Sequence, residues 1–180
     1  MKKFLTVIFI ILLSACSLMQ TNTPKERVRE LLDKYKNQDT NIVSKLDDVI
    51  STEYTGNYKE RYKELMLNQY KNMEYDITDE IIDGNTAIVT VDITVYNYGS
   101  TIENANEYLR NHEEEFYREN SETKEVDREK FMEYKLNLLE GTNDRKTYTL
   151  EFTLTKENDE WKLDNLSNEN ISKLHGIFIE

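Results

Sequence analysis

The sequence predicts an α+β fold in which N-terminal helices pack on an antiparallel sheet of about four strands. The apolar residues recur with a helical period over residues 24–72 and with a period of two near residues 75–96 and 147–163. Helices and hairpins in separate runs are typical of α+β domains. One proline and five glycines leave few breaks. We therefore predict one domain over residues 23–180.

Three helices are predicted before the first strand. The first begins at Thr23, which can cap a helix that has Pro24 in its first turn and Glu26 completing a capping box. Its apolar face consists of Val28, Leu31, Leu32 and Tyr35. A second, shorter helix is expected near Asn41, and a third over residues 58–72.

The first predicted hairpin joins strands over residues 75–82 and 87–96. The turn between them is Asp83-Gly84-Asn85, a sequence typical of tight hairpins. The second strand alternates strictly, and its inward side chains are Ala87, Val89, Val91, Ile93 and Val95. One face of the sheet is therefore core and the other half solvated, with Gly99 and Ser100 ending the strand.

A helical insertion is predicted between the two hairpins, over about residues 101–141. Its first helix has one apolar face, formed by Ile102, Ala105, Leu109, His112 and Phe116. Residues 118–125 are polar and predict a loop. Asp127 can cap a second helix that stops at Gly141 and whose shared face is Phe131, Tyr134 and Leu138. The pattern leaves open whether these helices pack on the domain or project from it.

The second predicted hairpin closes the sheet. Tyr148, Leu150, Phe152 and Leu154 alternate with polar residues on its first strand. A turn at residues 157–159 leads to a last strand with Trp161 and Leu163. Ser167 can cap a final helical turn.

The N-terminus carries an export signal. Lys2 and Lys3 precede an apolar run over residues 4–13, which is too short to span a bilayer comfortably. The run Leu13-Ser14-Ala15-Cys16 looks like the lipobox of a bacterial lipoprotein. It predicts a signal peptide over residues 1–15, lipidation of Cys16, and a polar tether over residues 16–22. An ordinary secretory signal with a chance cysteine is the alternative.

This signal predicts the location of the protein. Acyl chains such as palmitate on Cys16 would hold the protein to the cell membrane on its extracytoplasmic face. Cys16 is the only cysteine, so the domain has no disulfide and no catalytic thiol. A net charge of −12 opposes binding to nucleic acid, which needs clustered basic side chains.

Several pieces of the chain together resemble a known family. These are Leu13-Ser14-Ala15-Cys16, Thr23-Pro24-Lys25-Glu26, the strand Ala87-Ile88-Val89-Thr90-Val91, and the tail from Tyr148 to Leu166. The chain is similar to small Gram-positive bacterial lipoproteins of unknown function that carry a nuclear-transport-factor-2-like, cystatin-like cone domain. The resemblance implies a curved sheet wrapped around helices, often with a pocket between them. The insertion is longer than a minimal cone needs.

Enzymes of that superfamily place Asp/His pairs or a tyrosine inside the cone, but no such pair carries over to positions of this chain. His112 lies on the apolar face of the insertion and is expected to pack there. His175 is expected at the surface or at a helix C-terminus. Catalytic signature motifs are absent from the sequence. We therefore expect a protein that is not an enzyme and needs no cofactor.

A run of carboxylates raises the question of a metal site. Glu113, Glu114 and Glu115, with Glu119 and Glu122, could gather a calcium ion, which prefers six to eight oxygen ligands. A helical run points these side chains in different directions. A solvated face and no metal site are therefore expected.

Twelve tyrosines are many for a chain of this length. Tyrosine has an apolar ring with a polar tip, which suits packing, interfaces and ligand pockets. If the cone holds a ligand, its lining is expected to be Tyr62, Tyr96, Tyr148 and Trp161. The leading hypothesis is an interaction module for an unidentified envelope protein. The alternatives are a small-molecule-binding domain and, last, a cone-fold hydrolase or isomerase.

Overall fold

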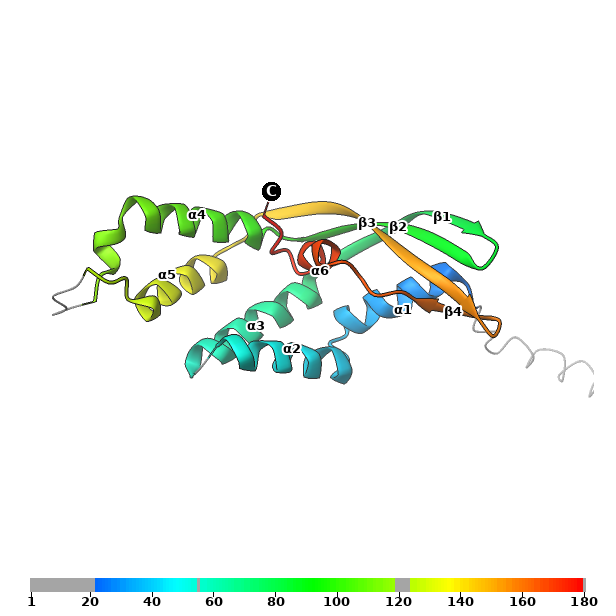
Figure 1. Ribbon diagram of the computed structural model, residues 1–180, viewed down its shortest axis with the longest axis horizontal. Coiled ribbons are helices and arrows are strands. Elements are labelled where there is room, and N and C mark those ends of the chain that lie inside the picture. Colours follow the sequence, from blue (N-terminus) through cyan, green and yellow to red (C-terminus); the bar gives the residue numbers. More distant parts are fainter. Residues whose placement is uncertain (1–21, 55, 119–123, 180) are drawn as a thin grey trace, which may run out of the picture.

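The computed structural model describes residues 22–54, 56–118 and 124–179, and it confirms the predicted α+β fold (Figure 1). Its elements are α1 (Pro24–Lys36), α2 (Thr40–Glu53), α3 (Asn57–Asn72), β1 (Glu74–Asp83), β2 (Thr86–Tyr96), α4 (Tyr98–Asn111), the 3-10 turn η2 (Glu113–Phe116), α5 (Arg128–Glu140), β3 (Arg145–Glu157), β4 (Glu160–Leu163) and α6 (Asn168–Leu174). The predicted signal peptide over residues 1–15, Cys16 and residues 17–21 of the tether lie outside the described residues.

The strands form one antiparallel sheet in the order β1-β2-β3-β4. The register places Val89 opposite Phe152 and Val91 opposite Leu150, so that apolar side chains of β2 and β3 share one face. Both predicted hairpin turns are present. Asn158 and Asp159 have φ angles of 50° and 65°, the left-handed values that a tight hairpin turn requires.

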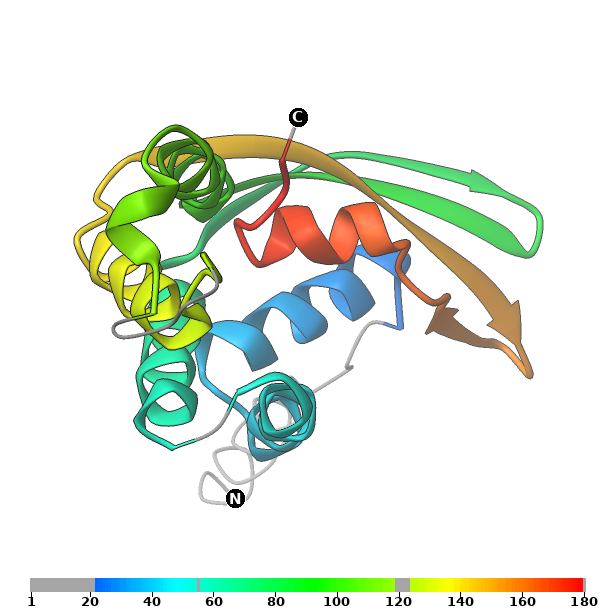
Figure 2. The same ribbon diagram turned by 60° about the vertical axis from the view of Figure 1, so that its left-hand side comes forward.

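Two helices cover the buried face of this curved sheet (Figure 2). α1 contributes Val28 and Leu32 to the main core, and α6 contributes Leu174. α2 and α3 form a second apolar cluster around Ile50 and Met66. It lies next to the main core, which packs against the sheet. The concave side of the sheet is therefore filled by the protein's own side chains.

The helix starts follow their predicted caps. Thr23 accepts a hydrogen bond from the Glu26 amide at 3.2 Å, and Asp127 accepts one from the Glu129 amide at 3.0 Å. One boundary was predicted wrongly, because Gly99 and Ser100 do not end the strand but lie in the first turn of α4. The signal for this start is Asn97, whose side chain accepts from the Ser100 amide.

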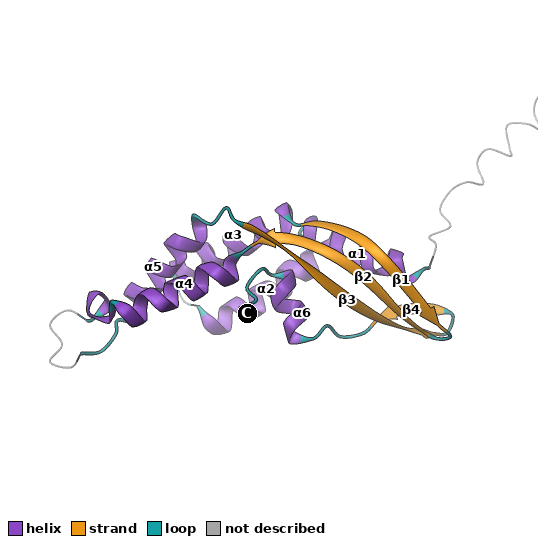
Figure 3. Ribbon diagram, turned by 90° about the horizontal axis from the view of Figure 1, so that it is seen from above, coloured by secondary structure: helices purple, strands orange, loops and turns teal. Residues whose placement is uncertain are grey.

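The insertion forms an arm, defined here as α4, η2 and α5, that extends away from the sheet (Figures 1 and 3). Its root packs on α3, where Leu136 and Leu139 join Leu65 in a buried cluster. The predicted face of α5 is therefore wrong at Leu138, which is 37% exposed. α5 packs on two sides, and its first turns instead place Phe131 against Phe116.

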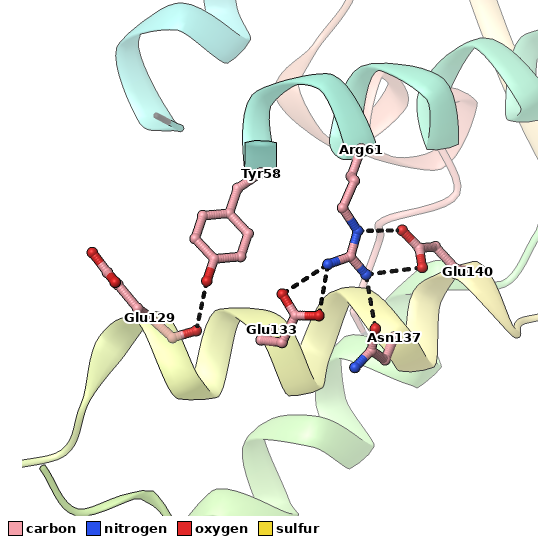
Figure 4. A network of polar contacts seen from close by, with 6 residues as sticks. All are labelled: Tyr58, Arg61, Glu129, Glu133, Asn137 and Glu140. Atoms are coloured by element: carbon pink, nitrogen blue, oxygen red, sulfur yellow. Dashed lines mark hydrogen bonds and ion pairs between the residues drawn. The ribbon is translucent and has the colours of Figure 1, made fainter. Parts of the chain in front are cut away.

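Arg61 of α3 fastens the root of the arm (Figure 4). Its Nη1 donates to both carboxylate oxygens of Glu133 at 2.8 Å, and its Nε donates to Glu140 at 2.7 Å. Its Nη2 donates to Asn137 at 2.8 Å and to Glu140 at 2.9 Å. Arg61 thereby bridges three successive turns of α5, a geometry that a planar guanidinium allows and an ammonium does not.

The buried apolar residues of the described chain run from Val28 to Leu174. These residues all lie within the predicted domain over residues 23–180, and we expect a chain that begins at Ser17 to fold by itself. Within the described residues, no helix combines the length and the apolar character needed to cross a membrane.

Candidate functional site

A pocket of about 290 Å³ lies among α1, α2, α3 and α6, on the helical side of the molecule. It is lined by Tyr35, Ile42, Lys45, Leu46, Val49, Ile50, Tyr54, Tyr62, Met66, Tyr70, Ile171, His175 and Ile177. Its walls are mostly aliphatic and aromatic, which is the usual lining of a small-molecule site.

The helical repeat places the pocket lining. α2 carries Ile42, Leu46 and Ile50 four residues apart, so that all three point to one side. α3 presents Met66 and Tyr70 in the same way. The chain reverses between α1 and α2 at Gln38, whose φ is 53°. This short connection brings the apolar face of α2 against α3.

Aromatic pairs stiffen the pocket wall. Tyr54 stacks on Tyr62 with ring centroids 4.5 Å apart, and Tyr35 meets Tyr70 edge to face at 5.1 Å. The imidazole of His175 lies 5.6 Å from the Tyr70 ring and 6.2 Å from that of Tyr35. The wall thus combines rings from α1 and α3 with rings at the C-terminal ends of α2 and α6.

His175 provides a polar group inside the pocket. Its Nε2 lies 3.3 Å from the Tyr70 hydroxyl oxygen. Burial lowers the pKa of His175 to about 4, and burial likewise raises the pKa of Tyr70 and of Tyr35 above the ordinary value. These three side chains are therefore neutral at pH 7, and the inner pocket disfavours charge.

His175 was expected at the surface or at a helix C-terminus, and the second alternative is confirmed. The residue does end α6, but its ring faces the pocket rather than the surface. Gly176, with φ of 70°, turns the chain so that it passes beside α3. An added Cβ at this position would lie 2.1 Å from Gln69 Nε2 and 2.2 Å from the Tyr96 carbonyl oxygen, so that only glycine fits.

Gln69 holds this junction together and was not singled out from the sequence. It is 1% exposed, and its Nε2 donates to the carbonyl oxygens of His175 at 2.9 Å and Tyr96 at 3.1 Å. Its Oε1 accepts from the Tyr96 amide at 2.8 Å. The sequence signal is a glutamine among Leu65, Met66 and other apolar residues of α3. Because such a position also occurs at the edge of an ordinary amphipathic helix, the signal alone is weak.

The mouth of the pocket has a different character. Val49 and Ile171 are 58% and 37% exposed, and both line the pocket. Lys45 also lines the pocket and is an exposed cation. Carboxylate side chains do not occur among the described residues that line this pocket.

The structure does not bring the four proposed ligand residues together. Tyr62 lines the helical pocket. Tyr96 packs on Tyr98, with ring centroids 5.8 Å apart, near the root of the arm. Tyr148 and Trp161 are buried in the main core on the sheet face. The sheet tyrosine and tryptophan are separated from the pocket because α1 and α6 fill the space under the sheet.

His112 and the acidic run lie on the arm. His112 is half-buried and stacks on Tyr108 with ring centroids 4.1 Å apart, in agreement with a packing role. The predicted helical face is wrong at His112 and Phe116, because α4 ends at Asn111 and Phe116 belongs to η2. Glu113, Glu114 and Glu115 form the exposed turn η2, whereas Glu119 and Glu122 lie outside the described residues. In the described ranges, no three His, Asp or Glu side chains are arranged to hold a metal ion.

A wider hollow of about 970 Å³ opens on the arm beside Leu109, Phe131 and Met132. Charged residues such as Arg118 and Glu125 also line it. The helical pocket is smaller, but its lining comes from four helices and the residues that follow them and is mostly apolar. It is therefore the candidate site.

Comparisons with known proteins assign no family. No family model and no curated protein matches the chain. A solved structure, that of the candidate lipoprotein ycdA of Bacillus subtilis, matches with 18% identity and a TM-score of 0.38. The match covers 77% of this chain and 44% of that one, so this chain spans less than half the length of the solved structure. Similarity at this level decides neither fold family nor function.

Proposed function

We propose that this protein is a non-enzymatic binding module tethered to the extracytoplasmic face of the cell membrane, and that its helical pocket takes the apolar part of a small molecule. One observation carries the proposal. It is the cavity of about 290 Å³ whose aliphatic and aromatic walls come from α1, α2, α3 and α6. This volume is at the lower end of the range for small-ligand sites.

The chemistry of the pocket favours binding over catalysis. General acid–base chemistry needs a titratable group poised near the working pH. The neutral His175 contacts tyrosines, and no described carboxylate side chain lines the cavity with it. An apolar ligand would cover the aliphatic and aromatic walls of the pocket, and removal of this surface from water favours binding.

The membrane tether rests on Leu13-Ser14-Ala15-Cys16. Two acyl chains on Cys16 would suffice for stable anchoring. The cone resemblance is a further part of the proposal, supported by a sheet that curves around α1 and α6 (Figure 2). In this protein, however, the proposed ligand site lies outside the sheet's concave side.

The arm supports a second candidate function, an interaction with an envelope protein. It extends away from the sheet (Figure 1) and groups aromatic side chains where α4, η2 and α5 meet. These are Tyr108, Phe116, Phe131 and Tyr134. Phe116 is only 4% exposed and lies at the centre of this cluster, so the half-buried Tyr108, Phe131 and Tyr134 would provide the contact area for a partner.

A neutral aromatic probe tests the pocket. We expect a chain beginning at Ser17 to bind 1-naphthol saturably, as followed by the probe's fluorescence. Ile171→Trp places a large ring at the mouth and should weaken binding at least tenfold. Ile88→Trp is the matched control, since Ile88 is also 37% exposed but lies on β2. The proposal is refuted if both variants bind 1-naphthol as tightly as the parent chain does, or if the parent chain shows no saturable binding.

A further inference from the structure

The inner walls of the pocket are suited to a hydrocarbon chain. The aliphatic side chains of Ile42, Leu46 and Ile50 on α2 face Met66 on α3, with Ile177 beyond α6. Ile50 and Met66 are each 1% exposed and pack together as the floor of the pocket, so a ligand group that lies on this floor exchanges water for apolar contact. Burying a methylene group contributes about 0.8 kcal/mol.

The interior also excludes charge. Burial keeps three of its ionisable lining groups, His175, Tyr70 and Tyr35, neutral at pH 7, because it lowers the pKa of the imidazole and raises the pKa of the two phenols. An ionised ligand group placed there would lose its hydration without gaining a counter-charge. Any ionic part of the ligand must therefore stay at the mouth.

The mouth carries a positive charge. Lys45 lies on α2, three positions after Ile42 and four positions before Val49. Residues with this spacing share one face of a helix, and all three line the pocket. Asp47 is paired with Lys63 at 2.8 Å. The exposed Asp48, three positions after Lys45, weakens the positive field of the ammonium group but does not line the pocket. A lysine here is notable because the chain as a whole has a net charge of −12. Val49 and Ile171 extend the apolar path from the interior to this ammonium group.

We infer that the ligand is a single-chain aliphatic carboxylate, with its chain in the pocket and its carboxylate at Lys45. This inference rests on the proposed binding function. A pocket of about 290 Å³ is at the small end of the range for ligand sites, which favours one aliphatic chain over a lipid with two.

Two amphiphiles of equal length and opposite charge test the inference. Calorimetric titration of the chain from Ser17 should show decanoate binding about two- to fivefold more tightly than decylammonium, the range of an exposed ion pair. The preference should shrink in high salt, because the pair is exposed. Lys45→Glu should reverse it.

Lys71→Glu is the matched control. Lys71 is exposed on α3 and does not line the pocket. Its substitution by Glu changes the net charge by the same amount as Lys45→Glu does. It should leave the preference within a factor of about 1.5 of the parent. Equal affinities for the two amphiphiles, or equal effects of the two variants, would overturn the inference even if 1-naphthol binds. Failure of 1-naphthol and both amphiphiles to bind would instead remove the proposed function itself.

Discussion

At the scale of single residues, His175 shows how folding changes an ordinary surface-type residue. Its position after α6 is a common place for histidine. The chain beyond it, turned by Gly176, brings the imidazole against Tyr35 and Tyr70. The neutral imidazole packs there at little cost, whereas the charged form loses its water.

This environment predicts a pH dependence of stability. His175 has a pKa of about 4 in the folded protein and near 6.5 when unfolded, so the unfolded chain binds more protons in between. The stabilisation is present above pH 6.5 and is lost as the pH falls toward 4. We expect the free energy of unfolding to drop by about 2 kcal/mol from pH 7 to pH 5.

Urea unfolding at several pH values measures this change. His175→Phe keeps an aromatic ring without a titrating group, so this part of the slope should vanish. His112→Gln should retain it, because His112 stacks on the arm instead. An unchanged slope in His175→Phe would show that other groups cause the dependence.

At the scale of elements, the arm depends on a few contacts at its root. α5 meets α3 through Leu136 and Leu139 and through Arg61. Glu133 and Glu140 remain 45% and 42% exposed, so solvent screens much of their attraction to Arg61. The bidentate geometry still favours one orientation of the two helices.

Removal of Arg61 should therefore destabilise moderately. We expect Arg61→Ala to cost about 1 kcal/mol and to lower Tm by about 2–4 °C. Arg29→Ala, which removes an exposed pair with Glu26 within α1, should cost only a few tenths of that. Thermal unfolding by circular dichroism distinguishes the two.

The same network has a defined response to acid. Hydrogen bonds from Arg61 hold the pKa of Glu140 below its usual value. The stabilisation is therefore present above the ordinary glutamate pKa and is lost as the pH falls through the lowered one. An Arg61→Ala effect of equal size at pH 7 and at pH 3 would contradict this account.

At the scale of the whole molecule, three regions converge on Gln69. It links α3 to the end of β2 through Tyr96 and to the end of α6 through His175. The end of α6 in turn lies beside the start of α4, where Gly99 donates its amide hydrogen to the Gly176 carbonyl at 2.7 Å. The sheet, the pocket and the arm therefore share one buried polar junction.

A substitution at this junction should affect the protein globally. Gln69→Leu conserves size but leaves buried backbone groups of Tyr96 and His175 without partners, at a cost of about 3 kcal/mol. Tm should fall by about 6–12 °C. Gln38→Leu removes one hydrogen bond, to the Leu67 carbonyl, and should cost at most about 1 kcal/mol. Equal losses would argue against a special role for Gln69.

The sequence by itself determined the elements and the inward faces of the strands. Thr23, Asp127 and Ser167 cap helices where predicted, and the alternation from Ala87 to Val95 matches the buried face of β2. These features are local. Caps act within one turn, and a period of two assigns each side chain to a face without reference to the rest of the chain.

Only the tertiary structure decided where the pocket lies and which residues line it. Four aromatic residues were proposed as ligand residues for the same reason, an apolar ring with a polar tip, yet of these four only Tyr62 lines the pocket. The other three are Tyr96, Tyr148 and Trp161. The difference arises because α6, from the end of the chain, fills the space under the sheet and turns His175 toward α3. Contacts between residues more than one hundred positions apart set this arrangement, and no local pattern encodes their register.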